Sequence, residues 1–177
     1  PDRGMYAASA IEDPVLREAA QALVAFPGGS GFLISPEGHV LTNAHVAQRA
    51  GRALTVIQNP GDPNPLWVEQ VFISEAWDLA LYQAEASAPL PWIPLCGAAP
   101  EVGQRVAVLG HLDPPRPRVS FGRVLRVGTK PDGRPTLEYD AWTDWGSSGS
   151  PVLDAAGTAV GMHRAWDAHG LSSGALL

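Results

Sequence analysis

The chain has 177 residues, of which 45% are hydrophobic and 17% charged, so it can bury a core and does not have the composition of a disordered chain. The net charge of -6 and the absence of any Lys/Arg run argue against nucleic acid or an anionic membrane as a partner. No apolar run approaches the ~18 residues of a membrane span, so none is expected.

A single cysteine, Cys96, excludes an internal disulfide and favours a reducing compartment. We therefore expect a cytoplasmic protein, with a secreted or periplasmic location left open. No signal peptide is visible and the chain does not begin with Met. The sequence predicts either a processed form or a domain of a longer protein.

The first predicted element is a helix from about Pro14 to Phe26. Apolar side chains recur there at helical spacing, proline suits a first helical turn, and the segment 27–29 (PGG) ends the helix. After it, short apolar runs alternate with turns, as the 19 glycines and 17 prolines suggest. We expect a first group of strands near 31–35, 39–43, 54–58, 68–73 and 79–83.

A segment rich in Ala and Pro, 85–100, reads as a connection between two groups of strands. The second group is expected near 105–110, 118–127, 136–141, 151–153, 159–163 and 174–177. Two groups of five or six strands predict an all-β fold of two packed antiparallel barrels. The expected division is a helical segment 1–27, a first barrel 28–95 and a second barrel 96–177, the two barrels forming one domain.

Three segments carry residues suited to nucleophilic catalysis. Ser148 lies in 146–152 (GSSGSPV), where small residues allow a loop to aim its N–H groups inward. His45 lies in 41–46 (LTNAHV) and Asp78 in 77–81 (WDLAL). A hydroxyl needs a base to remove its proton, and the base needs an orienting group. The three residues together suggest a serine peptidase.

These segments, with 29–34 (GSGFLI), resemble the trypsin-like serine peptidases of chymotrypsin fold, and most closely their bacterial glutamyl-endopeptidase and HtrA branches. The order His, Asp, Ser matches that family. The resemblance covers about residues 20–177. It implies that Ser148 is the nucleophile, His45 the general base and Asp78 its orienting partner, in a cleft between the barrels.

The resemblance also implies an oxyanion hole made by the main-chain N–H groups of Gly146 and Ser148. Each of the three residues could instead have a structural role: Ser148 as a turn residue, His45 as a structural histidine and Asp78 as a residue that caps a turn. Asp140 is the nearest competitor for the aspartate role. Neither a cofactor nor a metal site is predicted, because the other histidines have no metal-ligand spacing with each other or with Cys96.

Specificity is read from Thr143 and His163, which lie at the positions where glutamyl endopeptidases bind a substrate carboxylate. Both side chains can donate to a carboxylate, so the hypothesis is cleavage after Glu or Asp. Arg164 offers a further attraction for an acidic side chain, and Trp166 is expected to narrow the pocket mouth. The segment 164–166 is expected to pair with the substrate main chain.

We therefore expect a serine endopeptidase that acts on protein or peptide substrates as a regulated domain of a larger protein or system. A regulatory or scaffold partner, or a fused sensor domain, fits that expectation. Two alternatives stay open. One is a catalytically silent module that binds peptides or proteins, and the other is a quality-control protease of HtrA type.

Overall fold

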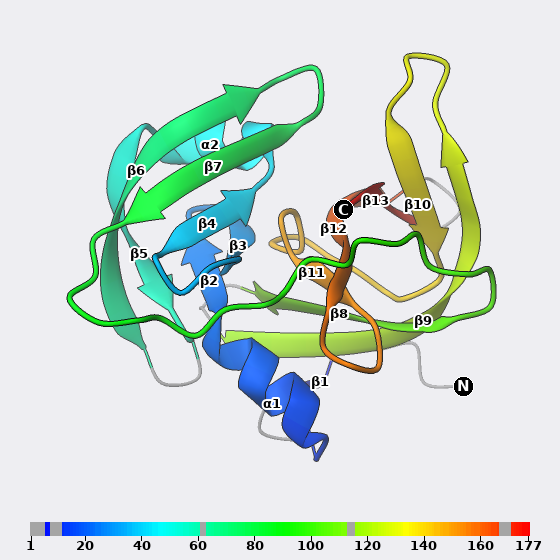
Figure 1. Cartoon of the computed structure of the whole chain (residues 1–177), viewed down its shortest axis with the longest axis horizontal. Coiled ribbons are helices and arrows are strands. Elements are labelled where there is room, and N and C mark those ends of the chain that lie inside the picture. Colours follow the sequence, from blue (N-terminus) through cyan, green and yellow to red (C-terminus); the bar gives the residue numbers. More distant parts are fainter. Residues whose placement is uncertain (1–5, 8–11, 61–62, 113–115, 167–170) are drawn as a thin grey trace.

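The computed structural model describes residues 6–7, 12–60, 63–112, 116–166 and 171–177. Within these residues the chain forms two barrels of antiparallel strands, side by side, with a short helix below them (Figure 1). Neither helix among the described residues has the length and hydrophobicity of a transmembrane span. The predicted all-β fold of two packed barrels is confirmed.

The first barrel closes in the order β2-β3-β4-β7-β6-β5, and all its pairings are antiparallel. Its strands are β2 (Leu23–Phe26), β3 (Gly29–Leu33), β4 (His39–Thr42), β5 (Ala53–Gln58), β6 (Asn64–Ser74) and β7 (Leu79–Ala84). A helix, α2 (Ala44–Ala50), follows β4 directly. The strand prediction did not include this helix, although it carries His45.

The second barrel runs β9-β10-β13-β12-β11-β8 and is closed by the pairing of β8 with β9. A further short strand, β1 (Tyr6–Ala7), pairs with the outer side of β9. The barrel strands are β8 (Arg105–Leu112), β9 (Arg116–Thr129), β10 (Pro135–Tyr139), β11 (Pro151–Leu153), β12 (Ala159–Trp166) and β13 (Ser172–Leu176). Between β7 and β8 the chain forms no strand beyond one isolated bridge at Leu95, as expected of the 85–100 connection.

The predicted N-terminal helix is shorter than expected. Helix α1 spans Pro14–Gln21, with Asp13 capping it through a 2.9 Å bond from the main-chain N–H of Val15. The expectation of helix from Leu23 to Phe26 is wrong, because these four buried residues form β2 and pair with both β3 and β5. A strand buried on both faces has no polar alternation, so its apolar residues extended the helical pattern by chance.

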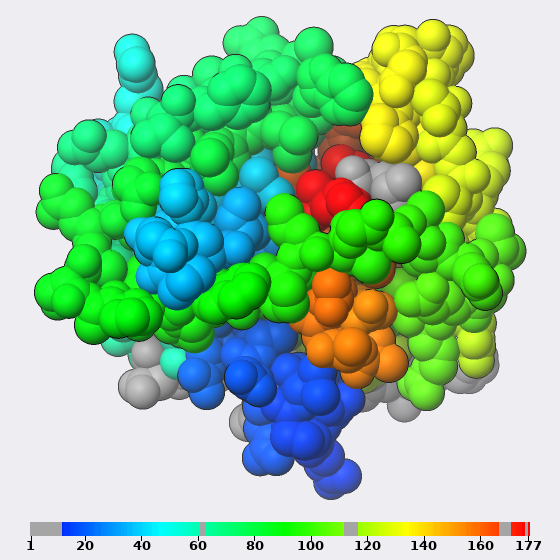
Figure 2. Space-filling model, viewed as in Figure 1, coloured from blue at the N-terminus to red at the C-terminus, as the bar shows by residue number. Residues whose placement is uncertain are grey.

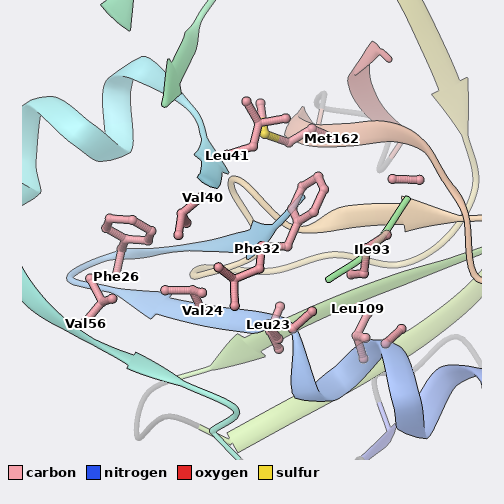
Figure 3. Close-up of a cluster of buried hydrophobic side chains, with 14 of the residues drawn as sticks. Leu23, Val24, Phe26, Phe32, Val40, Leu41, Val56, Ile93, Leu109 and Met162 are labelled. Carbon is pink, nitrogen blue, oxygen red and sulfur yellow. The ribbon is translucent and has the colours of Figure 1, made fainter. Parts of the chain in front are cut away.

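The largest hydrophobic cluster joins the two barrels and α1. Figure 3 shows part of it, with Phe32 and Leu41 from the first barrel and Leu109 and Met162 from the second. Leu16 of α1 also belongs to this cluster, so the helix covers the base where the barrels meet. A shared core holds the barrels in one relative position, which a cleft between them requires.

Replacing Phe32, which is fully buried in this cluster, tests that shared core. We expect Phe32→Ala to lower the free energy of unfolding by ~3–5 kcal/mol, because it removes buried apolar surface and leaves a cavity. Urea unfolding followed by tryptophan fluorescence measures the change. The matched control is Phe72→Ala on β6, where the ring is 55% exposed and the expected loss is below ~1 kcal/mol. Equal losses in the two variants would contradict the shared-core interpretation.

Candidate active site

His45 is held at the start of α2, on the side of the first barrel that faces the second. Its neighbour Asn43 lies at the N-cap position with extended main chain, and the Asn43 side-chain amide donates to the main-chain carbonyl of Asp78 at 3.2 Å. This bond ties the beginning of α2 to the turn between β6 and β7. Because β4 and β7 are paired strands, His45 and Asp78 start from neighbouring ends of one sheet.

Asp78 accepts two kinds of hydrogen bond from His45. The main-chain N–H of His45 donates to Oδ1 at 3.0 Å, and His45 Nδ1 lies 3.0 and 2.9 Å from Oδ1 and Oδ2. Asp78 has a positive φ of 51°, a conformation that aspartate tolerates in turns. Partial burial alone raises the pKa of Asp78, but the bonds from His45 and the charge of Arg164 outweigh it and hold the pKa below its usual value.

Arg164, on β12 of the second barrel, reaches across the cleft to the same carboxylate. Its Nε donates to Asp78 Oδ2 at 3.2 Å, and the Arg164 side chain is only 20% exposed. The guanidinium therefore contacts Asp78, whereas the sequence had suggested an attraction for substrate side chains. No sequence signal marked this contact, since the two residues are 86 positions apart.

Ser148 enters the same cleft from the loop between β10 and β11. Its hydroxyl donates to the main-chain carbonyl of Arg164 at 3.4 Å. His45, Ser148, Arg164 and Trp166 all line a pocket of about 270 Å³. The pocket thus brings His45 and Ser148 together, and Asp78 joins them through its bonds to His45, while the Ser148 proton is directed to the Arg164 carbonyl.

The Ser148 loop is fastened to the first barrel by Ser30. The Ser30 main-chain N–H donates to the Ser148 carbonyl at 2.7 Å, and the Ser30 hydroxyl donates to the Gly146 carbonyl at 2.8 Å. Gly149 allows this close approach, because a Cβ there would lie 1.8 Å from the Ser30 carbonyl oxygen. In the sequence, the segment 29–34 contributes only to the family resemblance. The structure shows that its serine, Ser30, binds the Ser148 loop.

A tight turn precedes the serine. The Ser147 N–H donates to the Asp144 carbonyl at 3.0 Å, and the Asp144 N–H donates to the buried Ser147 hydroxyl at 3.2 Å. Gly146, inside this turn, has a φ of 93°, which favours glycine. These contacts set the direction of the main-chain N–H groups just before Ser148. The sequence analysis did not predict this role of Ser147, and the only signal for it there is its place beside Ser148.

The two residues expected to recognise a substrate carboxylate are buried among other polar groups. The Tyr139 hydroxyl lies 2.6 Å from His163 Nδ1, and burial raises the pKa of Tyr139 well above its usual value. Burial, aided by the nearby charge of His45, lowers the pKa of His163 to about 3. His163 is therefore neutral at pH 7, with one ring nitrogen a donor and the other an acceptor.

Thr143 takes part in a chain of hydroxyl groups. Ser172 Oγ donates to the Ala141 carbonyl at 2.9 Å, and Thr143 Oγ1 lies 2.9 Å from Ser172 Oγ. Because the Ser172 proton is already used, Thr143 donates its own proton to Ser172. His163 thus lines the pocket, whereas Thr143 is a buried residue that orients Ser172.

A hairpin of the second barrel supports the turn that carries Asp78. Arg134, just before β10, donates to the main-chain carbonyl of Ala76 at 2.6 Å and is itself held by Asp132. Figure 2 shows the β9–β10 hairpin, in yellow, touching the turn after β6, in green. The cleft is therefore bridged by Arg134 at its rim as well as by Arg164 inside it.

A second cavity of about 690 Å³ adjoins the cleft. It shares Gly28, Arg49 and Trp145 with the pocket at Ser148, and Phe26 and Val56 add an apolar wall. Among the described residues, no group of three or more His, Cys, Asp or Glu side chains could hold a metal ion. The site thus offers a groove with a serine, a histidine and a carboxylate at its centre.

The model of the trypsin-like peptidase domain family matches residues 29–162, well over half of the chain. The chain belongs to this family of serine peptidases. Serine protease HTRA1 of Xenopus laevis is 29% identical over 144 residues, covering 76% of this chain and 30% of that protein. A probable periplasmic serine endoprotease, DegP-like, of Halomonas elongata is 30% identical over 139 residues, covering 76% of this chain and 28% of that protein.

Among solved structures, an inactive form of the Rv3671c protease of M. tuberculosis superposes with a TM-score of 0.81, covering 96% of this chain and 90% of that one. Its identity of 23% supports the shared fold alone. The chain spans about a third of the length of the curated relatives it matches. The relatives are of HtrA type, and the likeness to glutamyl endopeptidases stays a prediction.

The contact between Gly149 and Ser30 predicts that Gly149→Ala is strongly destabilising. Alanine would be strained at a φ of 86°, and its Cβ would also meet the Ser30 carbonyl. Gly133→Ala is the matched control, because Gly133 has a φ of 85° and open space around it. We expect ~1 kcal/mol for the control from φ alone and at least ~2 kcal/mol more for Gly149→Ala, measured by urea unfolding. Equal losses of stability in the two variants would show that the close contact between Gly149 and Ser30 of β3 adds no cost to the alanine substitution.

Burial of His163 predicts a loss of stability in acid. The unfolded chain protonates this histidine near pH 6.5, whereas the folded chain does so only at about pH 3, so stability is lost as the pH falls between these values. The expected loss is up to ~1.4 kcal/mol per pH unit. Urea unfolding at several pH values should show a weaker acid dependence in His163→Gln. His39→Gln, at a partly exposed histidine, should keep the wild-type dependence.

Proposed function

We propose that the protein is a serine endopeptidase that uses Ser148, His45 and Asp78 as nucleophile, general base and orienting carboxylate. The observation that carries the proposal is the pairing of His45 Nδ1 with both carboxylate oxygens of Asp78, within the cleft that also holds Ser148. This pairing keeps the Nδ1 proton on the carboxylate side. Nε2 is then free of a proton and can act as a base.

Catalysis begins with a rotation of the Ser148 side chain. The hydroxyl must leave the Arg164 carbonyl, a long bond of 3.4 Å, and turn toward His45. His45 then accepts the proton as Ser148 Oγ attacks the scissile carbonyl, and returns it to the leaving amine. Water hydrolyses the resulting acyl-enzyme by the same steps in reverse.

The main-chain N–H groups of Gly146 and Ser148 are proposed to hold the oxyanion. The Ser147 turn and the Ser30 contacts support this role, because they fix the loop from both sides. A rigid pair of donors needs no reorganisation as charge develops on the oxygen. Removing either set of contacts would loosen the hole and leave the triad in place.

The acyl side of the substrate is proposed to pair with residues 164–166 as an added strand. Trp166 is 54% exposed and Trp145 is 80% exposed, and both line the pocket around Ser148. Their rings provide apolar surface beside the scissile bond. The larger cavity beside Gly28 would then receive the leaving-group side, because it adjoins Gly146 and lies away from 164–166.

For the residue before the scissile bond we propose a preference for Glu, with Asp second. Support comes from His163, which lines the pocket at Ser148 and whose neutral ring keeps one N–H that can donate to a carboxylate. The neutral imidazole offers a hydrogen bond without an ion pair, and Thr143 directs its proton to Ser172. The expected discrimination between Glu and Gln is therefore modest, about tenfold or ~1.4 kcal/mol.

The relatives suggest a broader role as the peptidase domain of a larger protein, with a partner or further domain that regulates it. The shared region is about a third of each relative, which is consistent with a domain in a longer chain. A quality-control protease of HtrA type is the second candidate, favoured by the same relatives. The relative described as periplasmic favours a location outside the cytoplasm over the expected cytoplasmic one.

Cleavage of a diverse peptide library, read by mass spectrometry, tests the proposal. The wild-type chain should cut after Glu, and Ser148→Ala should lower the rate by at least ~10⁴-fold because it removes the nucleophile. Ser87→Ala, at an exposed serine in the connection between the barrels, is the control and should cut like wild type.

Each other result has a definite meaning. Cleavage by wild type after other residues keeps the peptidase and removes the carboxylate pocket. Cuts at many apolar sites of unfolded proteins favour the quality-control role. Binding of labelled peptide without any product, in wild type and Ser148→Ala alike, would overturn the peptidase in favour of a binding module.

A further inference from the structure

The carboxylate of Asp78 has one more partner than the orientation of an imidazole requires. His45 supplies its main-chain N–H and Nδ1, and Arg164 Nε binds Oδ2 as well. Oδ2 is thus shared between the imidazole, at 2.9 Å, and the guanidinium, at 3.2 Å. The Asp78 and Arg164 side chains are only 13% and 20% exposed, so solvent screens this positive charge less than it screens a surface charge.

Other charged and titratable groups lie near Asp78 and His45, but in the described part of the chain they are not bonded to the carboxylate. They come from each element packed around the pair: Arg49 on α2, Glu75 beside the turn, Arg134 in the β9–β10 hairpin, Asp144 in the nucleophile loop and His163 on β12. Arg134 is paired with Asp132, and Glu75 accepts a bond from Gln48. Among the described residues, Arg164 is the cation that pairs with the Asp78 carboxylate itself.

We propose, resting on the proposed function, that Arg164 is a positioning residue whose charge on Asp78 opposes protonation of His45 and so extends hydrolysis to lower pH. A nearby cation disfavours the imidazolium and favours the neutral base. The same cation favours the ionised form of Asp78. Both effects move the acid limit of activity in the same direction, toward lower pH.

The main chain of Arg164 links this charge to the nucleophile. Its carbonyl accepts the Ser148 hydroxyl while its side chain binds Asp78, so one residue of β12 contacts both ends of the triad. The ion pair also crosses from the second barrel to the first. Arg164 thereby holds the Asp78 carboxylate from the second barrel, while His45 binds it from the first.

The test measures how fast a fluorophosphonate labels Ser148 from about pH 4 to pH 9. In this reaction Ser148 Oγ attacks phosphorus, fluoride leaves and His45 takes the serine proton, so the rate reports the base without depending on peptide specificity. We expect Arg164→Gln and Arg164→Met to raise the midpoint of the acid limb by about half a unit to one unit. Arg164→Lys, which keeps the charge, should restore most of the difference.

Arg126→Gln is the matched control. Arg126 pairs with Glu138 on the outside of the second barrel and is 73% exposed, so its loss removes one positive charge far from the site. Its acid limb should coincide with that of wild type. The height of the plateau is a separate readout, because a merely structural role of Arg164 would lower the plateau and leave the limb in place.

The outcomes separate this inference from the proposed function. Labelling of wild type with unchanged acid limbs in Arg164→Gln and Arg164→Met overturns the role of the charge and keeps the peptidase. Failure of the wild-type chain to label Ser148 at any pH overturns the proposed function itself. Should Arg164→Gln not fold, as judged by near-ultraviolet circular dichroism, Arg164→Met retains the apolar stem and decides the question.

Discussion

The close docking of the Ser148 loop on the first barrel is the contact on which the arrangement of the site depends. Ser30 binds the main-chain carbonyls of Ser148 and Gly146, and Gly149 leaves room for that approach. Ser148, the proposed nucleophile, belongs to the second barrel and His45, the proposed base, to the first, so their separation is set by how closely the barrels meet. A shared hydrophobic core holds the barrels together, and the Ser30 bonds determine where the loop lies on that interface.

Charge is the second constraint on the cleft. Asp78 is partly buried and would be costly to keep ionised without partners, yet His45 and Arg164 hold its pKa below the usual range. His163, the neighbour of Arg164 on β12, is uncharged instead, because burial lowers its pKa. The site thus combines the ionised carboxylate of Asp78 with the uncharged imidazole of His163, and the surroundings of each residue determine its charge.

The resting position of Ser148 connects these two constraints. Its hydroxyl is bound to the carbonyl of Arg164, the residue whose side chain binds Asp78. A shift of β12 would therefore move the partners of Ser148 and of Asp78 together.

The sequence alone determined the fold class, most strands and the three segments that meet in the cleft, because strand alternation, turn residues and short motifs are local properties. It did not reveal β2 or α2, since a fully buried strand has no alternation and α2 is only seven residues long. Nothing in the sequence indicated the contacts of Ser30 with Gly146 or of Arg164 with Asp78 either. They join residues 116 and 86 positions apart, so only the packing of one barrel on the other decided them.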